Sequence, residues 1–331
     1  MDVLQPEAVR WLLDCRHQQR HPFTGAEPGG WGWTDLSGAV PDADDTPAAM
    51  LALAQVRRSS LSNPALDQQI EAACRAGANW LLGLQNRDGG WPTFCRGWGK
   101  LPFDRSGSDL TAHALRALHI WKGQMNGSKL GNGRRDAKEP TSRLAARQEK
   151  AIERGLAYLG RTQRADGSWL PLWFGNHDNR DDENPIYGTA RVLLAYETLG
   201  RKDQPAYKNG CDYLIKAQNA DGGWGGGDSV TRWLRQNGLP CVRERGGESI
   251  VSTVEESAVA LEALAGSGIA GYRATIIEGV RFLQDAIATD RCDHPWPIGF
   301  YFAKLWYHEQ LYPLILTTAA LGKAMAALKQ P

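Results

Sequence analysis

The fold is decided by the stretch Gln85-Asn86-Arg87-Asp88-Gly89-Gly90-Trp91, because the chain contains it three times in closely similar form. The segments 163–169 and 218–224 keep the same spacing of Gln, Asp-Gly and Trp. An Asp-Gly pair supplies the positive-φ turn that stops a helix. The Gln can bond both this turn and the start of the next helix, while the Trp packs across the helix end. Repeats of this length indicate a helical array or a closed ring.

Apolar residues recur at helical spacing through most of the chain, and strand-like alternation is rare. We therefore predict an all-α protein with a single domain over residues 1–331. Polar inserts are expected near 122–145, 176–185 and 226–250, as excursions from the surface. The expected helices lie at about 47–58, 64–83, 108–122, 147–162, 187–200, 252–266, 271–285 and 308–328.

The bulk composition excludes several classes of protein. A formal net charge of +1 argues against a nucleic-acid partner. The six cysteines are scattered without a Cys-x-x-Cys pair, which argues against a zinc site or a disulfide framework. The first thirty residues lack the pattern of a secretion signal, and no apolar run is long enough to span a membrane. We expect a cytoplasmic protein, and contact with the inner face of a membrane remains open.

Three carboxyl groups crowd into four positions at Asp42-Ala43-Asp44-Asp45, shortly after Trp31 and Trp33. Neighbouring carboxylates oppose each other's ionisation, so the cluster titrates as a unit and holds a proton at neutral pH. An acid held protonated among aromatic rings is suited to protonating something apolar. The alternative is a helix start in which Thr46 caps the helix and Pro47 occupies its first position. Capping explains one or two of the acids but not all three.

These segments resemble the C-terminal half of the squalene–hopene and oxidosqualene cyclases, the class II triterpene cyclases. The resemblance implies an α6/α6 barrel, the α/α toroid shared by terpenoid cyclases and protein prenyltransferases, and leaves open whether the ring is complete. It also implies an apolar polyene substrate, cyclisation begun by protonation of a terminal alkene, and no cofactor or metal. The resemblance is carried by the Gln-to-Trp repeats and by 41–46, 109–113, 167–169, 186–189, 252–253 and 307–314.

The resemblance assigns catalytic roles by position. It places the proton donor on Asp44, with Asp42 and Asp45 as the flanking carboxyls. The histidine that orients and acidifies the donor falls on His113. Asp109 lies four residues before His113, so both side chains share one face of a helix and can point at one site.

The resemblance also assigns aromatic residues to a substrate cavity, where ring faces stabilise carbocations by about 2 kcal/mol or more when water is excluded. Trp33 takes the place of a cavity Phe, Phe94 of a cavity Tyr and Trp173 of a cavity Trp. Tyr187, Tyr301 and Tyr307 complete the expected substrate-binding set. Leu305 and His308 occupy positions where the family pattern leads us to expect Tyr.

Two departures from the family pattern affect the functional prediction. A full family enzyme is about twice this length and carries a second α-barrel, so a second subunit with that barrel is a candidate partner. A cavity Trp that normally lies upstream of the Asp-x-Asp-Asp motif has no counterpart in this sequence. The alternative function is therefore a non-catalytic or partner-dependent half of a split cyclase that binds isoprenoids.

A third hypothesis is a Mg²⁺-dependent cyclase acting on a prenyl diphosphate. Asp178, Asp181 and Asp182 invite this reading, because hard cations take such carboxylates. A solvated loop explains these acids more simply. The basic stretch 129–135 is likewise expected to be a solvated loop, with a lipid-headgroup contact as the alternative. A protein prenyltransferase would need a zinc site, for which the sequence offers no suitable cluster.

Overall fold

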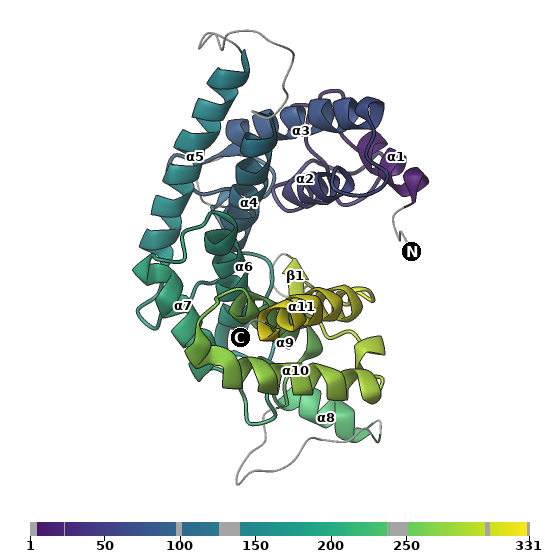
Figure 1. Cartoon of the computed structure of the whole chain (residues 1–331). Helices are drawn as coiled ribbons and strands as arrows, with labels where there is room; N and C mark the ends of the chain where they lie inside the picture. Colours follow the sequence, from purple (N-terminus) through teal and green to yellow (C-terminus); the bar gives the residue numbers. More distant parts are fainter. Residues whose placement is uncertain are drawn as a thin grey trace. The chain divides into compact units, whose positions relative to one another are not determined.

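The computed structural model describes residues 5–22, 24–96, 101–125, 140–236, 238, 251–301 and 305–329. The chain forms two compact units, Met1–Arg161 and Thr162–Pro331, and both are built almost entirely of helices (Figure 1). The prediction of an all-α protein is confirmed. None of the helices described here combines the length and the apolar character needed to cross a membrane.

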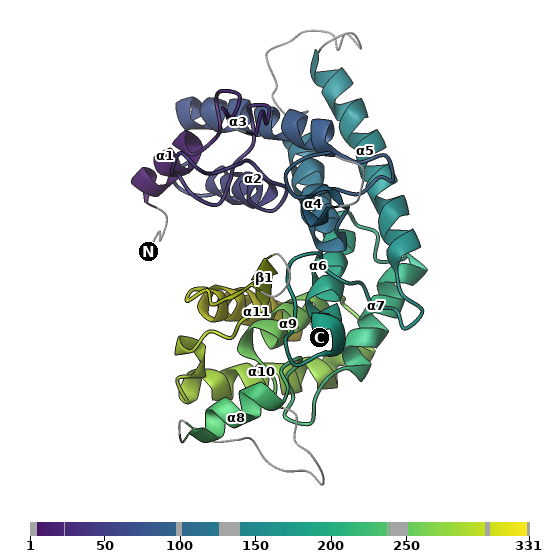
Figure 2. The same cartoon turned by 180° about the vertical axis from the view of Figure 1, so that it is seen from behind.

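The first unit places helix α2 against both α3 and α4, as the views from opposite sides show (Figures 1 and 2). Helix α3 begins where Asn63 accepts a hydrogen bond from the Leu66 amide and Pro64 occupies the first turn. The helices of the first unit are α1 (Pro6–Asp14), α2 (Asp45–Val56), α3 (Pro64–Leu84), α4 (Ser108–Met125) and α5 (Pro140–Thr162), with a 3₁₀ turn at Pro102–Asp104.

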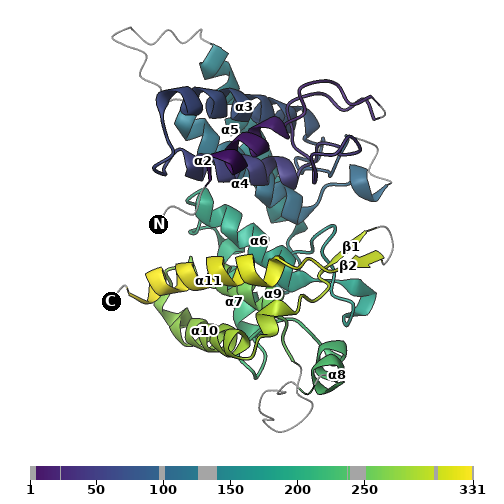
Figure 3. The ribbon, with the colours of Figure 1, turned by 90° about the vertical axis from the view of Figure 1, so that its right-hand side faces the viewer.

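The second unit is organised around α9, which packs against α6, α10 and α11 and is buried at every residue except Glu262. A short antiparallel hairpin, β1 (Gly299–Tyr301) and β2 (Leu305–Tyr307), precedes α11 (Figure 3). The helices are α6 (Pro185–Thr198), α7 (Pro205–Lys216), α8 (Asp228–Gln236), α9 (Val254–Ala265), α10 (Arg273–Ala288) and α11 (Tyr312–Leu328), with 3₁₀ turns at Arg180–Asp182, Ala270–Tyr272 and Arg291–Asp293.

The Gln-to-Trp repeat works in part as the sequence predicts. Gln85 donates from its amide to the Gly89 carbonyl of its own turn at 2.8 Å and to the Ala151 carbonyl of α5 at 2.9 Å. Each repeat glutamine therefore bonds its own turn as predicted, but the helix it ties to that turn is a later one and not the next helix expected from the sequence, since α4 lies between Gln85 and α5 in the chain. The equivalent pairs are Gln163 with Gly167 and Ala206, and Gln218 with Gly222 and Thr275.

The repeat also makes a second set of hydrogen bonds, which the sequence does not predict. The backbone N–H of each of the three repeat Trp residues donates to a hydroxyl on a later helix, and Trp31, which follows Gly30 in a weaker copy of the motif near the N-terminus, donates in the same way to Thr46 at 2.9 Å. The alternative in which Thr46 caps α2 is therefore wrong, because its hydroxyl is engaged with Trp31 and Asp44 occupies the cap position, while the Asp42 side chain accepts from the first amides. Pro47 is also the third residue of α2 and not the first. The other pairs are Trp91 with Thr111, Trp169 with Thr189, and Trp224 with Ser257.

The predicted helix ranges are confirmed to within a few residues, except that α5 starts seven residues before the expected 147 and that α1, α7 and α8 were not assigned ranges. Helix α8 corrects the prediction of a polar excursion at 226–250. Val230 and Leu234 of this helix pack against Val251, so its nine residues form an amphipathic helix. The polar residues on its other side give the segment the composition of a loop. Residues 126–139, with the basic stretch, and 239–250 lie outside the described part. The single-domain interpretation stays a prediction.

Candidate active site

Two Trp turns hold the acidic segment in place. The Asp42 amide donates to the Trp31 carbonyl at 3.0 Å, and the Ala43 amide donates to the Thr93 carbonyl at 2.9 Å. Trp31 belongs to the first turn, and Thr93 follows Trp91 of the second. The backbone at 42–43 is thus pinned on both sides immediately before α2 begins.

Asp42 organises the three carboxyls. Its Oδ1 accepts from the Asp44 amide at 2.8 Å and from the Asp45 amide at 2.7 Å, and its side chain is only 3% exposed. Burial, followed by the charge of Asp45, raises the pKa of Asp42 well above its usual value. Burial likewise raises the pKa of Asp45, which shares a side-chain hydrogen bond with Asp42. The pair therefore retains a proton that an isolated aspartate would lose.

Asp44 is the acid that meets the predicted histidine. Its Oδ1 lies 2.9 Å from His113 Nδ1, across 69 residues of sequence. Asp44 stands at the N-terminal cap of α2, and His113 lies on α4, which packs against α2. The imidazole is 7% exposed, whereas the Asp44 side chain is 40% exposed. The carboxyl is thus oriented from its buried side and open on the other.

Asp109 lies one helical turn before His113 and is buried. Burial first, and then the charges of Asp88 and Asp109, raise the pKa of the Tyr158 phenol on α5. The Tyr158 hydroxyl donates to the Ser106 carbonyl at 2.8 Å. The structure thus brings Asp109 near Tyr158, and a role for Asp109 beside Asp44 stays a prediction.

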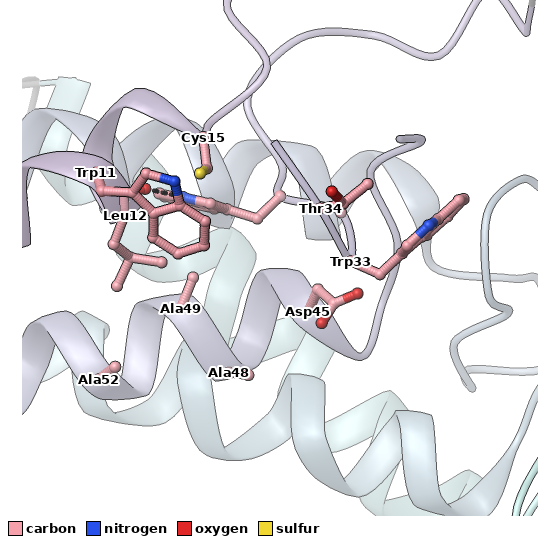
Figure 4. A pocket seen from close by; sticks show the side chains of 11 residues that line it. Trp11, Leu12, Cys15, Trp33, Thr34, Asp45, Ala48, Ala49 and Ala52 are labelled. Carbon is pink, nitrogen blue, oxygen red and sulfur yellow. Dashed lines mark hydrogen bonds between the residues drawn. The ribbon is translucent and has the colours of Figure 1, made fainter. Parts of the chain in front are cut away.

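Aromatic rings stand beside the acids in the first unit. Trp33 and Phe94 meet edge to face with ring centroids 5.8 Å apart, and Trp33 is 56% exposed. A pocket of about 300 Å³ lies between α1, the segment after Trp31 and the first turns of α2 (Figure 4). Asp45 is the carboxyl that lines it, together with Trp11, Leu12, Cys15, Trp31, Gly32, Trp33, Thr34, Ala48, Ala49 and Ala52. The sequence predicts Trp33 and Asp45 as site residues, whereas it gives no site signal for Trp11 or the three alanines.

The remaining predicted aromatic residues lie in the second unit. Tyr187 at the start of α6 stacks on Phe174 with ring centroids 4.3 Å apart, and the Arg191 guanidinium lies 5.6 Å from its ring centroid. Trp173 is half-buried, and Tyr307 on β2 is 40% exposed. The side chain of Tyr301 lies outside the described part. Their role as substrate contacts stays a prediction.

The insert at 176–185 is only partly a solvated loop. Asp181 is exposed, but Asp178 accepts hydrogen bonds from both the amide and the hydroxyl of Ser229 on α8. Asn176 is buried and donates to Glu256 on α9 at 3.1 Å. The insert is therefore anchored to two helices because its polar side chains have buried partners. Within the described ranges, no group of three His, Cys, Asp or Glu side chains could hold a metal ion.

Solved structures that share the fold include two terpenoid-forming enzymes. One is the type II terpene cyclase MstE from Scytonema, solved with geranylgeranyl dihydroxybenzoate, which matches 98% of this chain and 84% of its own at 15% identity and a TM-score of 0.56. Another is the ent-copalyl diphosphate synthase from Streptomyces platensis, which matches 96% of this chain and 49% of its own at 21% identity and a TM-score of 0.53. The chain thus has an α/α toroid fold.

The sequence comparison identifies the family. The family model for the squalene–hopene cyclase C-terminal domain matches residues 3–122 and 141–326, and the chain belongs to that family. A probable squalene–hopene cyclase from Sinorhizobium fredii is 30% identical over 299 residues, which are 86% of this chain and 39% of that enzyme. The chain therefore spans about two fifths of the length of this curated relative.

Proposed function

We propose that this chain carries the catalytic domain of a class II terpene cyclase of squalene–hopene type. The observation that carries the proposal is the contact between Asp44 and His113 within a cluster of three carboxyls. A carboxylic acid held by a buried imidazole is oriented for transfer of its proton to an alkene carbon. The Asp-x-Asp-Asp motif lies where family resemblance assigns the proton donor.

In the proposed reaction, Asp44 is the acid that starts the cyclisation. Asp44 gives its proton to a terminal alkene, whose π electrons form the new C–H bond and leave a tertiary cation. Successive double bonds of the polyene attack this cation until the final cation loses a proton to water, or adds water and the resulting oxonium ion releases a proton to solvent. The Asp44 carboxylate is then reprotonated, and its 40% exposure gives solvent access for that step. No cofactor is needed in this scheme.

His113 has a positioning role in this proposal. A buried imidazole beside the carboxyl fixes the side-chain rotamer and, when protonated, favours release of the carboxyl proton. The pair Asp42 and Asp45 retains its own proton, which limits the negative charge around Asp44. If both of these carboxyls were ionised, their negative charges would oppose release of the proton from Asp44.

The substrate we propose is an apolar isoprenoid, squalene or a shorter polyprene. A second subunit that carries a further barrel is the partner that we propose on the family resemblance. We also propose a cytoplasmic enzyme with access to the inner face of a membrane, since such a substrate resides in lipid. These assignments rest on the family and on the apolar pocket beside Asp45.

The decisive experiment is Asp44→Asn, tested with squalene and with a C20 polyprene, alone and with candidate partner proteins. We expect cyclised product to fall at least about 1,000-fold, because the variant lacks the transferable proton while its amide can still bond His113. Circular dichroism should show an unchanged fold. Asp203→Asn, at an exposed position of the second unit, is the matched control and should retain activity.

Full activity of Asp44→Asn would refute the mechanism. If the parent chain forms no product under any of these conditions but binds squalene, the non-catalytic alternative replaces the proposal. Product formation from a prenyl diphosphate that depends on added Mg²⁺ would instead support the diphosphate hypothesis.

A further inference from the structure

We propose that a small pocket at the start of α9, the Glu255 pocket, binds the hydroxyl group of a neutral alcohol whose carbon skeleton lies against Trp233 and Trp296. The pocket belongs wholly to the second unit, between α8, the first residues of α9 and the segment that follows α10. It is separate from the proposed proton transfer by Asp44, so it adds a binding site to the proposed function.

The pocket contains a buried oxygen atom that lacks a hydrogen-bond partner. Glu255 is 1% exposed, and its Oε1 accepts from the Trp296 amide at 2.6 Å. Its Oε2 has no hydrogen-bond partner among the described residues, and the side chain lines the pocket. Because an unpaired buried oxygen is costly, a polar group that enters the pocket and bonds Oε2 gains affinity from that bond.

The size of the pocket limits which group can enter. Its volume is about 20 Å³, which is enough for one water-sized group. Apolar side chains surround much of this space, namely Val230, Leu234 and Val254. A hydroxyl, a carbonyl oxygen or an amino group fits, whereas a carboxylate or phosphate group is too large.

The charge of the pocket favours a neutral group that both donates and accepts. Burial raises the pKa of Glu255 from 4.5 to about 7, while the charge of Arg291, which also lines the pocket, acts in the opposite direction. Both forms of the carboxyl are therefore populated near neutral pH. A carbonyl can only accept from the protonated form, and an ammonium group can only donate to the ionised form and is repelled by Arg291. A hydroxyl serves both forms.

Two indole rings give the alcohol an apolar surface beside this oxygen. The ring centroids of Trp233 and Trp296 lie 6.0 Å apart with their planes at 68°, and both side chains are partly buried. The exposed His294 packs edge to face on Trp233 with ring centroids 5.1 Å apart. An alcohol with its hydroxyl at Glu255 can therefore place its carbon skeleton on the indoles. Such a site rejects analogues that lack the hydroxyl.

Three ligands with the same six-membered ring test the hydrogen-bonding pattern. Cyclohexanol donates and accepts, cyclohexanone only accepts, and protonated cyclohexylamine only donates. The readout is ¹⁹F NMR of protein labelled with 5-fluorotryptophan, in which Trp233→Phe and Trp296→Phe assign the two resonances. Between pH 6 and pH 8 we expect the cyclohexanol affinity to change less than about twofold. The cyclohexanone affinity should fall about tenfold, as the protonated fraction of Glu255 does.

Variants then test the residues of the pocket. Glu255→Gln cannot ionise and should remove the pH dependence of cyclohexanone binding, whereas Glu262→Gln on the same helix should keep it. Trp233→Ala, followed through the Trp296 resonance, should weaken cyclohexanol binding at least about tenfold, because it removes one apolar wall. Arg232→Ala, at the exposed neighbouring position, is the matched control and should bind normally. Thermal melting shows that each variant is folded.

A second pair of ligands identifies the kind of alcohol. 2-Decalol has a bicyclic apolar skeleton like that of a cyclised terpenoid, and methyl β-D-glucopyranoside is a sugar. Saturable shifts of the Trp233 and Trp296 resonances with either ligand support the proposal, and the tighter ligand identifies the source.

Three results would overturn the proposal. They are unshifted indole resonances at the solubility limit of cyclohexanol, equal cyclohexanone affinity at the two pH values, and cyclohexylamine as the tightest ligand at pH 8. Asp44→Asn should bind cyclohexanol as the parent does, because Asp44 does not line the pocket. The pocket and the proposed cyclisation can therefore fail separately.

Discussion

The two units place a carboxyl cluster at the same point of the repeat, with different outcomes. Thr46 in the first unit and Ser257 in the second each accept the backbone N–H of a repeat Trp. Counting back from these hydroxyls, Asp45 corresponds to Glu256 and Asp44 to Glu255. The repeat therefore builds two equivalent acidic helix starts, and their surroundings decide what each carboxyl does.

Glu256 is a structural carboxylate. It accepts hydrogen bonds from the Thr253 hydroxyl at 2.6 Å, the Gly226 amide at 2.8 Å and the Asn176 side chain at 3.1 Å. These donors cross-link three segments of the second unit. Asp45, at the equivalent position, instead shares a side-chain hydrogen bond with Asp42 and lines a pocket.

Glu255 and Asp44 differ in access. Asp44 is 40% exposed and meets an imidazole, whereas Glu255 is 1% exposed. Glu255 Oε1 accepts from the Trp296 amide at 2.6 Å, and its Oε2 has no hydrogen-bond partner among the described residues. Asp44 therefore has both an orienting imidazole and an open side, whereas Glu255 has neither.

The largest expected effect in this comparison is the loss of Glu256. Glu256→Ala leaves several buried donors without an acceptor, so the free energy of unfolding should fall by about 3–5 kcal/mol. The measurement is a urea denaturation series at pH 7. Glu262→Ala on the same helix, at a partly exposed position, should change stability by less than about 1 kcal/mol. Similar losses in both variants would contradict the structural role of Glu256.

The next effect concerns pH and Glu255. Burial raises the pKa of Glu255 from 4.5 to about 7 in the folded chain. Between these values the folded state binds more protons than the unfolded state, so stability falls as pH rises. Above pH 7 the full penalty of about 3 kcal/mol is present, and below about pH 4 it is absent.

Glu255→Gln should remove this dependence. The amide oxygen can still accept from Trp296, and the side chain cannot ionise. We expect the variant to exceed the parent by about 3 kcal/mol at pH 8 and to match it near pH 4, in urea unfolding at both values. Glu262→Gln should follow the parent throughout. A constant difference across this range would show that Glu255 does not titrate with folding.

Much of the fold could be predicted because its signals are local. Asp-Gly turns and the Gln before them mark helix ends, and Pro64 and Pro185 mark helix starts. The pairing of a Trp amide with a hydroxyl could not be predicted, because it joins residues 15 to 33 positions apart whose proximity depends on helix packing. The sequence does not indicate helix α8, because nine residues offer too few turns to establish a period.

The candidate site also has one part that the sequence indicates and another that depends on helix packing. Crowding of Asp42, Asp44 and Asp45 is visible in the sequence, and family resemblance identifies His113 as their partner. The Trp11 pocket depends on how α1 packs over α2, so no local pattern indicates it. Three alanines on one face of α2 are the only trace of it in the sequence, and small residues on a helix face more often indicate close helix packing.

The smallest effect tests whether the two acidic helix starts are held alike. Thr46→Val and Ser257→Ala each remove the acceptor for a buried Trp amide, so each should lower the free energy of unfolding by about 1–2 kcal/mol. Thr318→Val, at an exposed position of α11, should stay within about 0.5 kcal/mol of the parent. Thermal melting by circular dichroism provides the comparison. Thr46→Val should also reduce cyclisation, since Trp31 anchors Asp42, whereas Ser257→Ala should not. Equal effects of the two variants on activity would show that the acidic helix start of the first unit has no special link to turnover.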